Sequence, residues 1–137
     1  MIIKTERKFS AAHRLPNYDG KCSRLHGHTW KVEVAIEGEP DVETGMLMDF
    51  VEIKNIIDDL DHQYLNDFIN NPTVENIAKY ILDNLARCQP RSDFKIRVWE
   101  TEDSFAEVDN QDKTATQGEI KENIGEIMGE NYGKITG

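Results

Sequence analysis

The sequence predicts an α+β domain in which two helices pack on one face of a four-stranded antiparallel sheet. Three observations support this prediction. Two N-terminal and two C-terminal segments have the pattern of strands, and the clearest of them alternates apolar and polar residues with period two. Two segments between them repeat apolar residues at helical spacing. The resulting order, strand–strand–helix–helix–strand–strand, is typical of an α+β domain.

The first two strands are expected at residues 2–13 and 25–37, with turn residues between them. In the second strand apolar and polar side chains alternate, so we expect it to be half-buried. Its two histidines, His26 and His28, continue the apolar face, which also carries Trp30, Val32, Val34 and Ile36.

Both helices are preceded by capping signals. The first is expected to begin at Asp49, which can cap it, and Glu52 completes a capping-box pattern. Its apolar side chains are Phe50, Ile53, Ile57 and Leu60. After a loop at residues 61–72, the second helix is expected to begin near Thr73, a good N-cap. It ends before Pro90, and its apolar stripe consists of Val74, Ile77, Ala78, Ile81 and Leu85.

Two more strands, at residues 94–100 and 104–109, complete the expected domain, which spans residues 1–109. Residues 110–137 differ from it because they are polar and interrupted by five glycines. We expect this segment to be a C-terminal extension with one weak amphipathic helix, since glycine disfavours helix formation.

The composition narrows the classes of function. The chain has 137 residues, with 16 Lys and Arg against 26 Asp and Glu, and its net charge is −10. A general nucleic-acid-binding protein needs a basic surface, so we expect no nucleic-acid partner. No apolar run approaches the ~18 residues of a membrane span, and the N-terminal residues lack a signal-peptide pattern. We therefore expect a cytoplasmic protein without a membrane partner.

The most informative cluster is His26-Gly27-His28. Histidines two residues apart on a strand point the same way, so both imidazoles can meet one ion. His13 ends the preceding strand and comes beside them if the two strands form a hairpin. Three neutral imidazoles suit Zn²⁺ and leave its fourth position open, as in catalytic zinc sites. The alternative is that the histidines only pack or form hydrogen bonds.

Cys22 lies four residues before His26, in the expected loop. It has three possible roles. It could be a fourth zinc ligand, which would close the site and make it structural. It could be a nucleophile or base beside the metal, because a zinc site lowers the pKa of a nearby thiol. It could also be an ordinary loop cysteine, and the residues alone leave the choice open.

Two further features carry candidate chemistry. In the dipeptide Asp61-His62, the carboxylate can hold the imidazole in one tautomer and support its protonated form, although most such pairs are simply solvated. Glu100 ends a strand on the same face as Phe94, Ile96 and Val98. A carboxylate there needs a partner, either a ligand with two adjacent N–H groups or a neighbouring Lys or Arg.

Five motifs resemble the 6-pyruvoyltetrahydropterin synthase superfamily, and they occur in the order expected for it. They are CSRLHGH (22–28), TGMLMDF (44–50), LDHQYLND (60–67), NPTVENIA (71–78) and WET (99–101). The resemblance covers residues 1 to about 109 and leaves out the extension. Within the superfamily the chain is more similar to the 6-carboxytetrahydropterin-forming group, because only three residues separate Cys22 from His26.

The resemblance implies the tunnelling fold and a set of site residues. Those that would bind Zn²⁺ are His13, His26 and His28. Those with catalytic roles would be Cys22 as the proton-abstracting thiol, Asp61 and His62 as a relay pair, and Glu100 as the pterin anchor. Thr73 matches a threonine near the pterin. Lys21, Arg24 and Arg14 are candidate phosphate contacts because they are the cations nearest to the cysteine motif.

The resemblance also implies a reaction. The substrate would be 7,8-dihydroneopterin triphosphate, and the products would be 6-carboxy-5,6,7,8-tetrahydropterin, acetaldehyde and triphosphate, in queuosine biosynthesis. The partner would be further copies of the chain, in a homohexamer with active sites at subunit interfaces. Two alternatives remain. One is 6-pyruvoyltetrahydropterin synthase activity, and the other is a non-catalytic zinc-stabilised binding module in which Cys22 completes the metal site.

Overall fold

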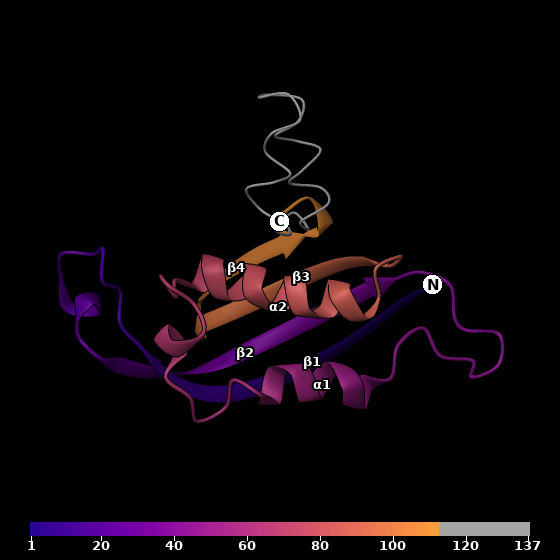
Figure 1. The fold of residues 1–137 in the computed structure, drawn as a ribbon, viewed down its shortest axis with the longest axis horizontal. Coiled ribbons are helices and arrows are strands. Elements are labelled where there is room, and N and C mark those ends of the chain that lie inside the picture. Colours follow the sequence, from indigo (N-terminus) through magenta and orange to yellow (C-terminus); the bar gives the residue numbers. More distant parts are fainter. Residues whose placement is uncertain (113–137) are drawn as a thin grey trace, which may run out of the picture.

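Figure 1 shows the computed structural model, which describes residues 1–112. The chain forms β1 (Ile2–His13), β2 (His26–Glu37), α1 (Phe50–Asp58), α2 (Val74–Cys88), β3 (Asp93–Thr101) and β4 (Ser104–Asp109). The strands are antiparallel and lie in the order β1-β2-β3-β4. The predicted fold class is therefore confirmed. The weak helix predicted in the C-terminal extension lies outside the described residues.

Both helices cover the same face of the sheet (Figure 1), where α1 packs on β1 and α2 packs on β3 and β4. The apolar face predicted for β2 is correct, because Trp30, Val32, Val34 and Ile36 are all buried. The stripes of the helices meet them, with Ile53 and Ile57 from α1 and five residues of α2 fully enclosed. Burial of these side chains is the main force that holds the layers together.

Both predicted helix starts are confirmed, with one difference in detail. The Asp49 side chain accepts a hydrogen bond from Val51 N–H, and Thr73 accepts one from Asn76 N–H. Asp49 thus caps the second helical amide of α1 rather than the third, which a capping box requires. No helix among residues 1–112 is long and apolar enough to cross a membrane.

The structure differs from the sequence pattern at two element ends. The second strand is expected to begin at Leu25, but β2 begins one residue later, and Leu25 is 66% exposed. Phe50 was expected in the apolar stripe of the first helix, yet it is 44% exposed. Phe50 is the first helical residue, and the sheet contacts of α1 are made one turn later by Ile53 and Ile57.

The connection between the two helices is more ordered than the loop predicted there. It contains a short 3-10 helix, Leu65–Asp67, and its residue Tyr64 forms a parallel bridge with Ala12 of β1. Ala12 N–H also donates to the Gln63 carbonyl at 3.1 Å. Leu65 is fully buried and anchors the connection in the core. The connection therefore runs along the otherwise free edge of β1, beside the end that carries His13.

Leu65→Ala should destabilise the domain by ~2–5 kcal/mol, because it leaves a cavity where the inter-helix connection enters the core. The check is the free energy of unfolding from a denaturant titration. Protein concentration is kept fixed, because assembly of the chain would make the apparent stability depend on it. Phe68→Ala is the matched control, since Phe68 is 44% exposed and should cost about 1 kcal/mol or less. Equal losses for the two variants would show that Leu65 does not anchor this segment.

Candidate metal centre and active site

The three histidines expected to meet at one point do lie together, at the junction of β1 and β2. His13 is the last residue of β1 and pairs with His26, the first residue of β2, while His28 pairs with Ala11. His26 and His28 extend from one face of β2, as their spacing predicts. The candidate donor atoms of the three side chains lie within 4.8 Å of one another. The register of one hairpin therefore assembles the cluster.

Backbone carbonyls fix the orientation of two of the imidazoles. His13 Nδ1 lies 2.7 Å from the Pro72 carbonyl, and His26 Nδ1 lies 2.8 Å from the Arg24 carbonyl. A carbonyl only accepts, so both Nδ1 atoms are assigned as donors. Each neutral ring then presents the lone pair of Nε2, and these two Nε2 atoms are 3.0 Å apart. Two lone pairs facing each other at this distance repel unless a cation lies near both.

The third imidazole supplies a further unpaired nitrogen. His28 Nε2 is buried and has no hydrogen-bond partner among residues 1–112. A buried polar atom without a partner is costly, so it calls for an explanation. A metal ion bound by all three nitrogens satisfies His28 and removes the repulsion between the other two rings.

Electrostatics favours the neutral, metal-binding form of the cluster. Burial lowers the pKa of His13, and the positive potential of His26 and His28 lowers it further, against the raising effects of the Pro72 hydrogen bond and Glu100. Burial likewise lowers the pKa of His28, against the attraction of Glu100. Neutral imidazoles with carbonyl-bound Nδ1 atoms are the usual zinc ligands in proteins. The residues therefore fit a Zn²⁺ ion.

Cys22 lies outside the group of donor atoms that cluster within 4.8 Å. It sits in a 3-10 turn, Lys21–Ser23, and is half-buried. Its carbonyl accepts a hydrogen bond from Leu15 N–H at 2.8 Å, which ties the turn to the end of β1. In this conformation the thiol is therefore not one of the clustered donor atoms, which favours a role other than closing the site.

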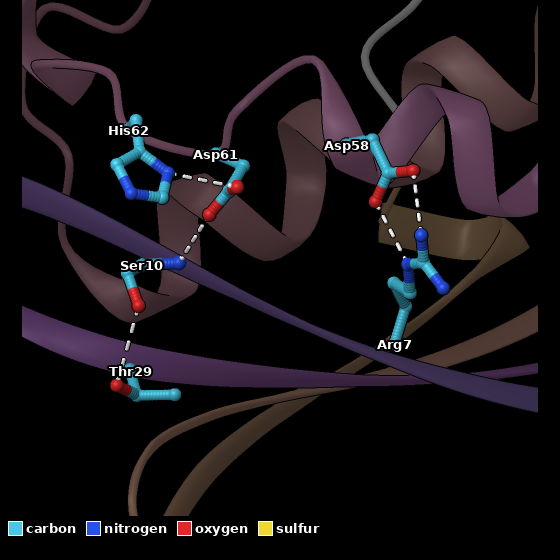
Figure 2. A network of polar contacts seen from close by, with 6 residues as sticks. All are labelled: Arg7, Ser10, Thr29, Asp58, Asp61 and His62. Atoms are coloured by element: carbon cyan, nitrogen blue, oxygen red, sulfur yellow. Dashed lines mark hydrogen bonds and ion pairs between the residues drawn. The ribbon is translucent and has the colours of Figure 1, made fainter.

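Asp61 and His62 form a hydrogen-bonded pair on the edge of β1 (Figure 2). His62 Nδ1 donates to Asp61 Oδ2 at 2.8 Å, and Ser10 N–H donates to Asp61 Oδ1 at 2.8 Å. These bonds lower the pKa of Asp61, the one from Ser10 most strongly and the one from His62 next. The His62 side chain is 83% exposed, so its Nε2 is presented to the surroundings.

The backbone at His62 is held in an unusual conformation. Its φ is 60°, a left-handed value that costs energy for residues other than glycine. Its N–H donates to the Ser10 carbonyl at 2.6 Å, which compensates for part of this cost. Nearby, Arg7 and Asp58 form a double ion pair of 2.8 and 2.9 Å that joins the end of α1 to β1 (Figure 2).

Glu100 lies near the end of β3, one residue after Trp99, which pairs with Lys31 of β2. It is half-buried, and its charge acts on both His13 and His28. The structure thus brings Glu100 into the neighbourhood of the histidine cluster. No ion pair joins its carboxylate to a Lys or Arg among residues 1–112. Of the two partners considered from the sequence, a neighbouring Lys or Arg is therefore not found among these residues, and a ligand with two adjacent N–H groups remains.

The other substrate-contact candidates have different surroundings. Lys21 and Arg24 are exposed and flank Cys22. The Arg14 guanidinium is turned to the Ser23 carbonyl, with Nε at 3.3 Å. Thr73 already uses its hydroxyl oxygen to cap α2, at 3.1 Å from Asn76 N. A structural role for Thr73 is therefore plain, whether or not it also meets a substrate.

Two supporting groups could not be found by looking for reactive side chains. One is the Pro72 carbonyl, which holds the His13 ring. The other is Asn66, whose side chain binds the backbone of Arg14. The only signal for either was its place in a family motif, since backbone carbonyls and amide side chains carry no chemical signature in a sequence.

Comparisons with known proteins agree with this geometry. The family model described as 6-pyruvoyl tetrahydropterin synthase matches residues 2–111. Proteins named 6-carboxy-5,6,7,8-tetrahydropterin synthase are similar to the chain. The one from Synechocystis is 40% identical and that from Haemophilus influenzae 33%, over 73% and 77% of this chain and 86% and 96% of their own lengths.

Two other relatives have different names. A dihydroneopterin monophosphate aldolase of Pyrococcus furiosus is 38% identical, over 67% of this chain and 82% of its own length. The solved structure of 6-pyruvoyl tetrahydropterin synthase from Caenorhabditis elegans superimposes with a TM-score of 0.61 at 27% identity, covering 84% of this chain and 97% of that one. Sequence and fold lead to the same conclusion: the chain belongs to the 6-pyruvoyl tetrahydropterin synthase family.

Proposed function

We propose that this pterin enzyme is a zinc-dependent lyase acting on 7,8-dihydroneopterin triphosphate. The products would be 6-carboxy-5,6,7,8-tetrahydropterin, acetaldehyde and triphosphate, and the first of these would feed queuosine biosynthesis in the cytoplasm. The observation that carries the proposal is the cluster of three imidazole nitrogens, one of them buried without a partner among residues 1–112, on which the charge of Glu100 acts. The short Cys22–His26 spacing and the names of two relatives support the carboxy-forming reaction.

His13, His26 and His28 would hold the zinc ion through their Nε2 atoms. Bound zinc would act as a Lewis acid toward the hydroxyl groups of the substrate side chain. The carbonyls of Pro72 and Arg24 would keep the rings of His13 and His26 oriented, since each carbonyl accepts a hydrogen bond from an Nδ1–H. Cys22 lies outside the ligand group, so a position for substrate oxygen remains open.

Cys22 would act as the base that removes a proton from carbon, with its thiolate sulfur as the acceptor. His62 would move the second proton through Nε2, because Nδ1 is committed to Asp61. Asp61 would stabilise the imidazolium that forms, and Ser10 N–H would keep that carboxylate in place. Glu100 would accept two hydrogen bonds from the N–H groups of the pterin and thereby fix the ring.

The positions of these groups favour a site completed by a second copy of the chain. His62 borders an open hollow of ≈ 510 Å³ that is also lined by Ser10, Ala12, Thr29 and His28. The His62 side chain is 83% exposed, and the hydrogen bond given for it is to the adjacent Asp61. Its Nε2 would therefore be able to serve the cluster of a neighbouring subunit. This is the arrangement expected for a hexamer with shared active sites.

Lys21 and Arg24 would contact the triphosphate, with Arg14 as a further candidate. Both flank Cys22 and have exposed side chains, so they are free to reach outward. Their charge matters because the chain as a whole carries −10, which repels an anionic substrate. Thr73 would lie near the pterin while capping α2.

The deciding experiment is incubation of the zinc-loaded protein with 7,8-dihydroneopterin triphosphate, with products read by mass spectrometry and acetaldehyde trapped. Release of acetaldehyde together with 6-carboxytetrahydropterin is expected. A 6-pyruvoyl product would keep the zinc site and overturn the carboxy assignment. Dihydroneopterin monophosphate should be tested as a second substrate, because one relative is named as an aldolase of this compound. Turnover of the monophosphate alone would indicate aldolase activity in place of the proposed reaction. No turnover of either with zinc bound would favour a binding module.

Cys22→Ala separates a catalytic from a structural cysteine. If Cys22 is the base, the variant should keep one zinc per chain while kcat falls by about 10²–10⁴-fold, the usual loss for a general base. Metal content is measured by elemental analysis and turnover by the product assay. Cys88→Ala is the matched control, because Cys88 is exposed at the end of α2 and should change neither quantity. Loss of zinc in Cys22→Ala would show that the thiol is a zinc ligand and that its role is structural.

The metal-free protein should lose stability as the pH falls below about 6.5, the ordinary pKa of histidine. The pKa of His13 and of His28 is lower in the folded chain. Between the two values the unfolded chain binds more protons, so protonation favours unfolding. The readout is Tm between about pH 7.5 and 5.5, and zinc should delay the loss because it competes with protons.

His13→Gln should flatten this dependence on pH. Gln63→Ala is the control, since that side chain is exposed and does not titrate, and it should leave the slope as in the parent protein. A Tm that is constant over this range in the metal-free protein would show that His13 and His28 are not held neutral.

A further inference from the structure

The connection between α1 and α2 runs along the end of β1 and forms hydrogen bonds with alternate residues of that strand. Ser10 binds His62 and Asp61 through its backbone, and Ala12 N–H donates to the Gln63 carbonyl. These are alternate residues of β1, whose backbone groups face the free edge because β2 occupies the other side. The next residue with the same orientation is Arg14, just beyond the strand.

At Arg14 a side chain replaces the backbone of the connection. Asn66 Oδ1 accepts from Arg14 N–H at 3.0 Å, and Asn66 Nδ2 donates to the Arg14 carbonyl at 2.9 Å. One amide group thus satisfies both backbone groups of Arg14, as a paired strand residue would. Asn66 is half-buried within the short 3-10 helix, next to the fully buried Leu65. Packing of Leu65 in the core therefore holds Asn66 in place for this pairing.

Arg14 and its neighbours hold the reactive groups on either side. His13, which directly precedes Arg14, is a member of the imidazole cluster. Leu15 N–H donates to the Cys22 carbonyl at 2.8 Å, and Arg14 Nε donates to the Ser23 carbonyl at 3.3 Å. A displacement of Arg14 would consequently move both the His13 ring and the turn that carries Cys22.

We propose that Asn66 is a positioning residue for the reaction, which sets the Cys22 turn and His13 relative to one another through the backbone of Arg14. The inference rests on the proposed function and deepens it. Among residues 1–112 the Asn66 side chain forms its hydrogen bonds with the backbone of Arg14 and none with the imidazole cluster or the thiol. Its effect is geometric, and a misplacement of about 1 Å in such a site costs on the order of 10²-fold in rate.

The test compares Asn66→Leu with Asn110→Leu in a Cys88→Ser background. Leucine has nearly the shape of asparagine but neither donates nor accepts hydrogen bonds. Asn110 is the matched control, because it also accepts from a backbone N–H (Phe94, 2.6 Å) and donates to a carbonyl (Ser92, 3.1 Å). It lies at the opposite end of the sheet from the histidines, beside the start of β3.

Five quantities are measured for each variant: kcat, KM, zinc per chain, Tm and the rate of Cys22 alkylation by iodoacetamide. For Asn66→Leu we expect kcat to fall about 10- to 100-fold, with KM and zinc content close to those of the parent. The alkylation rate should change severalfold. Asn110→Leu should lose a similar amount of Tm while keeping kcat and the alkylation rate. The corresponding aspartate variants give the same comparison if a leucine variant fails to fold.

Other outcomes would overturn the inference. If Asn66→Leu keeps the parent kcat, or loses no more activity than Asn110→Leu at equal Tm, Asn66 has only a structural role. If the parent itself shows no turnover, the proposed function fails, and alkylation then decides about Asn66 separately. An unchanged alkylation rate of Cys22 in Asn66→Leu would reject the positioning role in that case as well.

Discussion

The cross-strand pairing of His13 with His26 is the contact on which the candidate site depends. It brings the Nε2 atoms of the two rings to 3.0 Å while their Nδ1 atoms remain bound to carbonyls. A slip of one residue in this register would turn the histidines of one strand to the opposite face. The register is fixed by the burial of Trp30, Val32, Val34 and Ile36 further along the same face. Core packing therefore determines the geometry of the histidine cluster.

The connection after α1 joins this centre to the rest of the fold. It carries the Asp61–His62 pair, covers the free edge of β1, and ends at Pro72, whose carbonyl holds the His13 ring. Thr73 then caps α2, and Leu65 anchors the segment in the hydrophobic core. A single segment of the chain thus orients a residue of the histidine cluster, presents an exposed imidazole and leads into a helix. The family motif at 60–67 falls within this segment, and the motif at 71–78 begins in it and continues into α2.

Much of the fold follows from local patterns in the sequence. Alternation identified the buried face of β2 and, with it, the direction of His26 and His28, because one apolar face forces the whole strand into register. Capping residues located both helix starts. Exposure at the start of an element was harder to predict: Phe50 is apolar yet 44% exposed, because it is the first residue of α1 and the buried residues of this helix are Ile53 and Ile57. Asn66 and the Pro72 carbonyl act through backbone geometry, which becomes visible only when segments distant in sequence meet.

In the proposed site, three histidine nitrogens hold a zinc ion whose remaining position is open. X-ray absorption at the zinc edge of the loaded protein reads these ligands. We expect a first shell of nitrogen and oxygen atoms at about 2.0–2.1 Å, with the outer-ring scattering of imidazoles and no sulfur. A sulfur atom at about 2.3 Å would overturn the proposed site, because Cys22 would then be a zinc ligand and could not serve as the base.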